Sequence, residues 1–291
     1  MAVMIGDSGG IAVGVESTYG TAASTKVWQS PISASLGLRK SLIENGVLRA
    51  TYPASRKYAR GYTDGDTVVA YHRKRSVNSV ILGSLGTLAT NTYTFGAGTA
   101  PTNTVGNTVW IDRGGHLSQH TGCILTKLRW DLAANQPVKL TAEWLGRAGT
   151  KETPVTITAP SETDIQYDSD LATFTLGGST ICILAATIEI AAQVTGADRA
   201  CLGGAHIKKP VVYGEYTITA SLTCELATDT GDNTVAELDD YIAGTATGDL
   251  VIDDWTLAGT YMTGDFPPLQ PGVIQFPLNL RANYMTLVTE A

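Results

Sequence analysis

The chain has 291 residues, of which 43% are hydrophobic and only 16% are charged, and its formal net charge is −7. A chain of this length buries about three quarters of its unfolded surface, so it needs no disulfide or metal to hold a core. The absence of a run of about 18 apolar residues argues against a membrane-spanning helix, and the lack of a basic segment before an apolar one at residues 1–7 argues against a secretory signal.

The N-terminal third contains a predicted arm, two predicted loops and one predicted helix. Residues 1–27 are rich in Gly and Ser and are predicted to form an extended arm. Residues 39–75, rich in Arg, Lys, Tyr and Gly, and the Thr/Asn/Gly tract at 89–108 are predicted loops, and loops of this size usually bind a partner. Residues 76–88 are predicted to form a short helix with an apolar stripe made of Val77, Val80, Ile81, Leu85 and Leu88.

The middle of the chain alternates between apolar and polar residues with a period of two. In residues 124–132, one face carries Leu128, Trp130 and Leu132, and residues 138–146 alternate again after a turn. This pattern predicts a hairpin with one buried face and one hydrated face. The Gly- and Pro-containing residues 147–161 are expected to join two halves of the chain.

The second half continues with strands. Residues 181–190 and 215–226 are predicted strands. The sequence Cys-Ile-Leu occurs at both 123–125 and 182–184, which suggests either a weak internal duplication or a chance resemblance between strands.

A helix and two further strands are predicted near the C-terminus. Residues 234–243 begin with a Thr-x-x-Glu capping-box spacing, which predicts a helix. Residues 250–261 and 273–281 are predicted strands, and Pro277 indicates an edge or a bulge in the second of them.

Several patterns that could carry chemistry lack the partners that the chemistry needs. The Gly-Asp-Ser-Gly-Gly run at 6–10 spells a serine-protease nucleophile, but an N-terminal tail cannot position a base. His116 and His120 have no Cys or Glu ligand nearby, and the acidic residues at 229–237 lack the spacing of a calcium loop. Asp253-Asp254 is interpreted as a strand face. No catalytic residue, cofactor or metal ligand is therefore predicted, and the four dispersed cysteines are expected to be reduced thiols in a protein folded in the cytosol.

The charge is unevenly distributed along the chain. Residues 1–150 carry about +7 and residues 151–291 about −14. The stretch 39–75 mixes basic and tyrosine residues, a combination that can hold single-stranded nucleic acid. The net charge of −7 argues against nucleic acid, and an acidic protein surface is the favoured partner of this basic stretch.

Three motifs resemble those of the tail tube proteins (major tail proteins) of phages with long, non-contractile tails. Residues 14–21, Gly-Val-Glu-Ser-Thr-Tyr-Gly-Thr, resemble the family's Gly-x-Glu-Thr-x-Tyr-Gly-Thr opening, with Ser in place of the commoner Thr. Residues 120–123, His-Thr-Gly-Cys, resemble the Tyr/His-x-Gly-Cys motif before a long strand, and Glu143-Trp144-Leu145-Gly146 resembles the end of the strand after it. The order of the later elements, with a Gly-rich loop at 202–204, extends the resemblance over nearly the whole chain.

The resemblance implies a mainly β protein with a β-sandwich or barrel-like core, one or two short flanking helices, an extended N-terminal arm and a long loop. Residues 28–280 would form one tail-tube domain, with possible pseudo-repeat halves at about 28–150 and 160–280, and residues 281–291 a C-terminal tail. Copies would form hexameric rings with a β-barrel lumen, and the rings would stack around the tape measure protein. The tube would later conduct double-stranded DNA.

Further partners and the contact residues also follow from the resemblance. Tail terminator and distal tail proteins would bind the tube, which would be assembled in the host cytoplasm into the virion without membrane insertion. Inter-subunit contacts are expected at Glu16, Tyr19, Arg39, Lys40, Arg56, Lys57, Arg60 and Arg73. Part of the acidic half is expected to line the channel and repel DNA phosphates, and the lumen-facing candidates are Glu189, Glu215 and Glu225. Deleting residues 1–20 is expected to abolish stacking and leave the core folded.

Two other classes of function remain open. A β-sandwich binding or decoration module on a virion or cell surface would have a concave aromatic site, whereas the 7% of aromatic residues are dispersed. A hydrolase on a β scaffold would need a catalytic triad or dyad, and the sequence shows neither.

Overall fold

The computed structural model describes residues 9–290 except 41, 45–55, 59–60, 99, 154, 172, 196–207, 213–215, 226–242, 244 and 264–274. In this part of the chain, antiparallel strands predominate beside one α-helix, α1 (Arg75–Gly83), and two short 3-10 helices, η2 (Glu162–Asp164) and η3 (Asp168–Asp170). The mainly β fold is thus confirmed. The helix predicted at 234–243 lies, apart from Ala243, outside the described residues.

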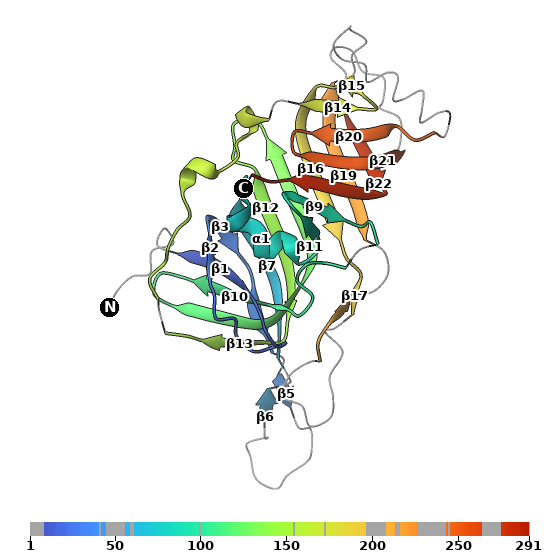
Figure 1. Ribbon diagram of the computed structural model, residues 1–291. Coiled ribbons are helices and arrows are strands. Elements are labelled where there is room, and N and C mark those ends of the chain that lie inside the picture. The colour runs from blue at the N-terminus through green and yellow to red at the C-terminus, as the bar shows by residue number, and fades with distance from the viewer. Residues whose placement is uncertain are drawn as a thin grey trace.

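A long central sheet crosses the molecule (Figure 1). All of its neighbouring strands are antiparallel. In spatial order the strands are β3 (Pro31–Ala34) with β4 (Gly37–Arg39), β7 (Tyr62–Ala70), β12 (Lys139–Gly146), β11 (Leu117–Ala133), β16 (Ile183–Ala191), β19 (Thr217–Glu225), β22 (Gln275–Ala282) and the end of β21 (Trp255–Thr263).

Two flanking sheets pack on the central sheet, one toward each end. Each is joined to the central sheet by a shared strand, since β11 and β21 both begin in a flanking sheet and continue in the central one. The first contains β2 (Val27–Gln29), β1 (Gly10–Val15), β10 (Asn107–Asp112), the start of β11 and β13 (Ala148–Lys151). The second contains β15 (Ser179–Thr180), β14 (Phe174–Leu176), β20 (Gly248–Ile252), the start of β21, β23 (Tyr284–Val288), β9 (Thr92–Phe95) and β8 (Thr87–Ala89).

Two small hairpins complete the strands. They are β5 (Leu42–Glu44) with β6 (Arg56–Tyr58), and β17 (Val194–Thr195) with β18 (Val211–Val212). Among the described residues, the two end strands of the central sheet do not pair with each other, so the sheet is open. The core is therefore a sandwich of sheets, and the expectation of a barrel-like core for the single chain is corrected.

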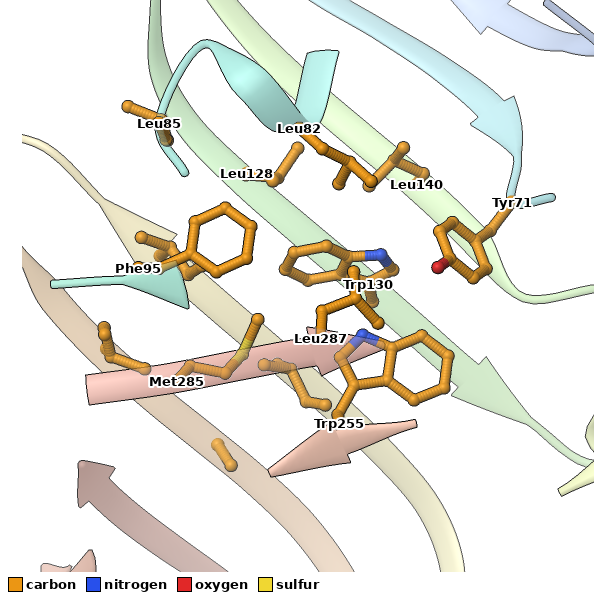
Figure 2. Packing of buried hydrophobic residues seen from close by; sticks show 14 of the residues in the cluster. Tyr71, Leu82, Leu85, Phe95, Leu128, Trp130, Leu140, Trp255, Met285 and Leu287 are labelled. Carbon is orange, nitrogen blue, oxygen red and sulfur yellow. The ribbon is translucent and has the colours of Figure 1, made fainter. Parts of the chain in front are cut away.

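The predicted hairpin of the middle region is confirmed as β11 and β12, and its apolar face forms the centre of the core. Leu128 and Trp130 are fully buried. The Trp130 ring meets Phe95 edge-on at 6.1 Å and Trp255 edge-on at 6.4 Å between ring centroids. Figure 2 shows Trp130 between Phe95 and Tyr71, with Trp255 beside it. One hydrophobic cluster therefore joins residues from both halves of the sequence.

The predicted helix at 76–88 is shorter in the structure. α1 ends at Gly83, and Leu88 belongs to β8. Two glycines, Gly83 and Gly86, weaken the end of the helix, and a side chain at Gly86 would lie 2.6 Å from the Phe95 ring. Leu85 is nevertheless buried, so its place on the apolar side was predicted correctly.

Three predictions of irregular structure are corrected. Part of the predicted arm is β1, whose Ala12 and Val13 are fully buried between neighbouring strands, so deleting residues 1–20 would also remove a core strand. The predicted loop at 39–75 contains β7, a strand of the central sheet, and the predicted loop at 89–108 contains β9. Pairing with distant strands stabilises these polar segments, and local sequence patterns do not record such pairing.

The C-terminal strands are also refined. The predicted strand at 250–261 is a hairpin of β20 and β21, because the chain turns at Asp253, whose φ is 48°. β22 confirms the last predicted strand. Its Pro277 pairs with Thr223 of β19. In the described part of the chain, the pairing of β22 with β21 begins at Asn279, and an edge position of this kind tolerates the missing N–H of proline.

Candidate functional site

Two of the three motifs, 14–21 and 120–123, meet at one buried carboxylate. Only 1% of Glu16 is exposed. Its carboxylate accepts hydrogen bonds from the backbone N–H of Gly20 at 2.6 Å and of Gly122 at 2.7 Å, and from the Thr108 hydroxyl at 2.9 Å. The loop after β1 is thereby tied to β10 and β11. Burial raises the pKa of Glu16, while these hydrogen bonds and Arg147 act in the opposite direction.

Glycines make room for the ring of Tyr19 beside this carboxylate. A side chain at Gly122 would lie 2.9 Å from the Tyr19 ring, and one at Gly106 would lie 3.1 Å from it. Both glycines have positive φ, 66° and 149°, a conformation that other residues seldom adopt. Lys209 lies 5.8 Å above the Tyr19 ring. Motif residues distant in sequence therefore form one packed unit, which we call the Glu16 site.

The comparison with known protein families agrees with these motifs. The family model described as phage tail tube protein matches residues 6–282. The chain belongs to the phage tail tube protein family. Curated proteins give no match to this chain. As a phage tail tube protein, it is a structural component of the virion tail.

In this tail tube protein, the structure places the expected contact residues in different environments. Glu16 and Tyr19 belong to the Glu16 site, inside the chain. Arg39 is 59% exposed on β4, within 4.0 Å of Asp64 on β7, and Lys40 is exposed beside it. The side chains of Arg56 and Lys57 and all of Arg60 lie outside the described residues. The role of these residues between subunits stays a prediction.

Arg73, another expected contact residue, forms ion pairs within the chain. Its guanidinium binds Asp253 and lies 3.5 Å from Asp254, so Asp253-Asp254 forms the turn between β20 and β21 and not the expected strand face. Burial raises the pKa of Asp254, as does Asp253, and Arg73 lowers it. Arg73 thus holds the second flanking sheet to the end of β7.

Replacing Arg73 by alanine is expected to lower the free energy of unfolding by about 1–2 kcal/mol, because two partly buried carboxylates lose their cation. Arg39→Ala is a matched control with an exposed ion pair, for which a change below about 0.5 kcal/mol is expected. Urea unfolding followed by fluorescence measures both. Equal effects of the two substitutions would show that the Arg73 cluster has no special role.

The lumen-facing candidates are described only in part. Glu189 lies on the outward face of the central sheet, where Lys127 stands 3.4 Å from both Glu189 and Glu143. Glu215 lies outside the described residues, as does the side chain of Glu225. Lys127 thus shares one positive charge between Glu189 and Glu143, and whether Glu189 faces a lumen stays a prediction.

The histidines and acidic residues that could have suggested a metal site do not form one among the residues that the structure describes. His120 is 3% exposed and packs against Gly149, and burial, followed by the charge of Arg113, lowers its pKa to about 4. In the described part of the chain, no three acidic, His or Cys side chains cluster as a metal site. No helix there is long and apolar enough to cross a membrane. Residues 6–8 and 229–237 lie outside the described residues.

The burial of His120 predicts a loss of stability in weak acid. In the unfolded chain a histidine titrates near pH 6.5, so between about pH 6.5 and 4 the unfolded state binds more protons than the folded state. The free energy of unfolding should therefore fall as pH drops through this range, by at most about 3 kcal/mol from this residue. His120→Gln should flatten the pH dependence in urea unfolding. His72, whose pKa burial also lowers, should retain part of the slope, whereas an unchanged slope would contradict the role of His120.

Glu16 and Gly122 stand in separate sequence motifs that do not reveal their contact, and no motif includes Thr108, Gly106 or Arg147. Gly106 lies inside the Thr/Asn/Gly tract at 89–108, which was predicted only as a loop. Nothing local marks Thr108 as the partner of Glu16, because the two are 92 residues apart.

Proposed function

We propose that the chain is the structural subunit of the tube of a long, non-contractile phage tail. Copies join into rings, and the rings stack around the tape measure protein and later conduct double-stranded DNA. The observation that carries this proposal is the family match over residues 6–282. The Glu16 site supports it, because two motifs of the resemblance, 14–21 and 120–123, meet there. The resemblance implies rings of six copies.

We further propose that the outward face of the central sheet lines the channel. This face is long, and its charges pair with each other. Lys127 lies between Glu143 and Glu189, and Arg129 lies 2.9 Å from Asp131. Cations already paired with carboxylates attract phosphates weakly, so DNA would slide along this surface. A lumen with a strong net positive charge in an assembled tube would contradict this assignment.

The remaining partners belong to the same proposal. The tail terminator and distal tail proteins would bind the two ends of the tube, and assembly would take place in the host cytoplasm. The role of the chain in all of these steps is structural, as a wall that other components contact.

Negative-stain microscopy of the purified protein tests the function directly. We expect rings or tubes of uniform width when the protein is concentrated or when salt is varied. A chain that stays monomeric in all conditions, and that antibodies do not find along phage tails, would contradict the proposal. That result would favour a decoration module on the virion or cell surface.

A further inference from the structure

The central sheet repeats one strand order twice. In the first unit (β1 to β13), the four strands of this sheet are, in chain order, β3–β4, β7, β11 and β12, and they lie in the order first, second, fourth, third. In the second unit (β14 to β23), β16, β19, β21 and β22 lie in the same order. A small hairpin follows the first strand of each unit, β5–β6 and β17–β18. In Figure 1, β5, β6 and β17 lie toward the same end of the molecule.

The pairing register is repeated as well as the order. The ladder between β7 and β12 has eight residue pairs, and so has the ladder between β19 and β22. Each pair of the first ladder corresponds to one pair of the second, with a constant difference in residue number between β7 and β19 and between β12 and β22. Their end pairs are Lys139–Ala70 and Gly146–Thr63 in the first unit, and Gln275–Glu225 and Ala282–Ile218 in the second.

Irregularities recur at corresponding positions. The β3–β7 ladder skips Ile32 after its first pair, and the β16–β19 ladder skips Leu184 after its first pair. The ladders of β10 with β11 and of β20 with β21 both shift register after their first pair. Gly122 and Gly259, with φ of 66° and 58°, lie where β11 and β21 leave a flanking sheet for the central one. Repeated bulges with repeated register are far more specific than a shared fold class.

We infer that the chain is a tandem duplication of one tube unit, and that copies of the chain join by repeating, between chains, the junction of β11 with β16. The inference rests on the proposed function in that it requires the chain to assemble with itself. Within the chain, this junction pairs the third strand of the first unit with the first strand of the second, over seven residue pairs. The corresponding strands at the two ends of the central sheet are β21 and β3–β4.

The edge formed by β3 and β4 is unpaired on its outer side among the described residues, and its apolar side chains are those expected of a strand that another strand covers. Leu38 on β4 pairs with Thr63 as Ile190 on β16 pairs with Ile218, so Leu38 and Ile190 correspond. Ile190, at the internal junction, is fully buried, whereas 37% of Leu38 is exposed. Among the described residues, β3 and β4 pair only with β7. An unpaired edge with exposed apolar side chains is a template for pairing with another chain.

The opposite net charges of the two halves of the chain indicate that the second unit of another copy binds this edge. The first half of the sequence carries about +7 and the second about −14, so a contact of second unit to first unit brings opposite charges together. The internal junction has the same polarity, because Lys127 of the first unit pairs with Glu189 of the second. Such a contact joins two different surfaces head to tail and generates a ring when the rotation closes.

The duplication changes the expected number of chains in a ring. Each chain supplies two units, so a ring contains twice as many units as chains. If the six positions of the ring are occupied by units and not by whole chains, three chains close it, in place of the six copies that the resemblance implies. The ring would have true three-fold symmetry and approximate six-fold symmetry.

The experiment compares two leucines of equal exposure. Leu38 and Leu184 are each 37% exposed, but only Leu38 lies at the proposed contact. In the full chain, Leu38→Asp is expected to give a folded monomer of 30.6 kDa, with circular dichroism and melting like those of the wild type. Leu184→Asp should assemble as the wild type does. Native mass spectrometry of wild-type rings should give three chains, and averaged images should show six similar densities with three-fold symmetry.

Each other outcome overturns the inference. Leu38→Asp chains that still form normal rings would show that the β3–β4 edge is not the contact, and the proposed function would stand. Equal loss of rings in both variants would show that the edge matters no more than any exposed leucine. Rings of six chains would contradict the counting of two units per chain. A wild-type chain that never self-associates would contradict both this inference and the proposed function.

Discussion

Replacing Glu16 by alanine is expected to lower the free energy of unfolding by about 3 kcal/mol. The substitution removes the acceptor of three hydrogen bonds, so the N–H groups of Gly20 and Gly122 and the Thr108 hydroxyl lose their partner. A buried donor without a partner costs about 1–3 kcal/mol. Part of this cost is recovered because the buried carboxylate itself, with its raised pKa, no longer has to be desolvated.

Glu143→Ala is the matched control for this substitution. Glu143 lies on the outward face of the central sheet and pairs only with Lys127 at 3.4 Å among the described residues, so a change of at most about 1 kcal/mol is expected. Glu16→Gln should fall between the two, since one amide oxygen can still accept while the amide NH2 faces other donors. Urea unfolding measures all three variants. A Glu16→Ala protein as stable as the wild type would show that the carboxylate is not a structural tie.

Replacing Trp130 by alanine is expected to cost about 3–5 kcal/mol of stability, because a fully buried aromatic side chain leaves a cavity that its neighbours cannot fill. Figure 2 shows why collapse is difficult, since Phe95, Tyr71 and Trp255 surround the ring on different elements. Thermal melting and urea unfolding measure the loss, and the exposed Tyr284 provides a control for which Tyr→Ala should change stability by less than about 0.5 kcal/mol.

The contact between Trp130 and Trp255 provides a more specific test of the same core. Trp130 belongs to the first unit and Trp255 to the second, and their rings meet edge-on at 71°. A double-mutant cycle with Trp255→Leu should give a coupling energy of about 0.5–1.5 kcal/mol. Strict additivity would show that the two units do not share this core, despite the single cluster in the structure.

Periodic hydrophobic patterns predicted the elements with the strongest local signal. The alternation of Leu128, Trp130 and Leu132 was enough to predict the β11–β12 hairpin and its buried face, because a period of two places side chains on one side of a sheet wherever the strand lies. β7 escaped prediction because Asp64, Gly65 and Asp66 lower its strand propensity, and only its pairing with β12 along eight residues stabilises it.

The candidate site was predictable as motifs but not as a site. The Gly-x-Glu motif and the Gly-Cys motif were both found in the sequence, yet the hydrogen bond from Gly122 to Glu16 joins residues 106 positions apart. The internal duplication shows the same limit. The Cys-Ile-Leu repeat that suggested it falls on β11 and at the start of β16, strands that do not correspond between the units, whereas the pairings that do correspond share few identical residues.

The sequence by itself determined the class of the protein. Composition and strand periodicity indicated a mainly β protein, because these properties depend on residue types and spacing along the chain. The resemblance of three short motifs to those of tail tube proteins implied a structural role in phage tails. Only the tertiary structure decided which strands pair, that β1 is core, that Arg73 is bound within the chain, and that two units share one register. These features depend on contacts between residues far apart in the chain, and many different sequences satisfy the same backbone pairing.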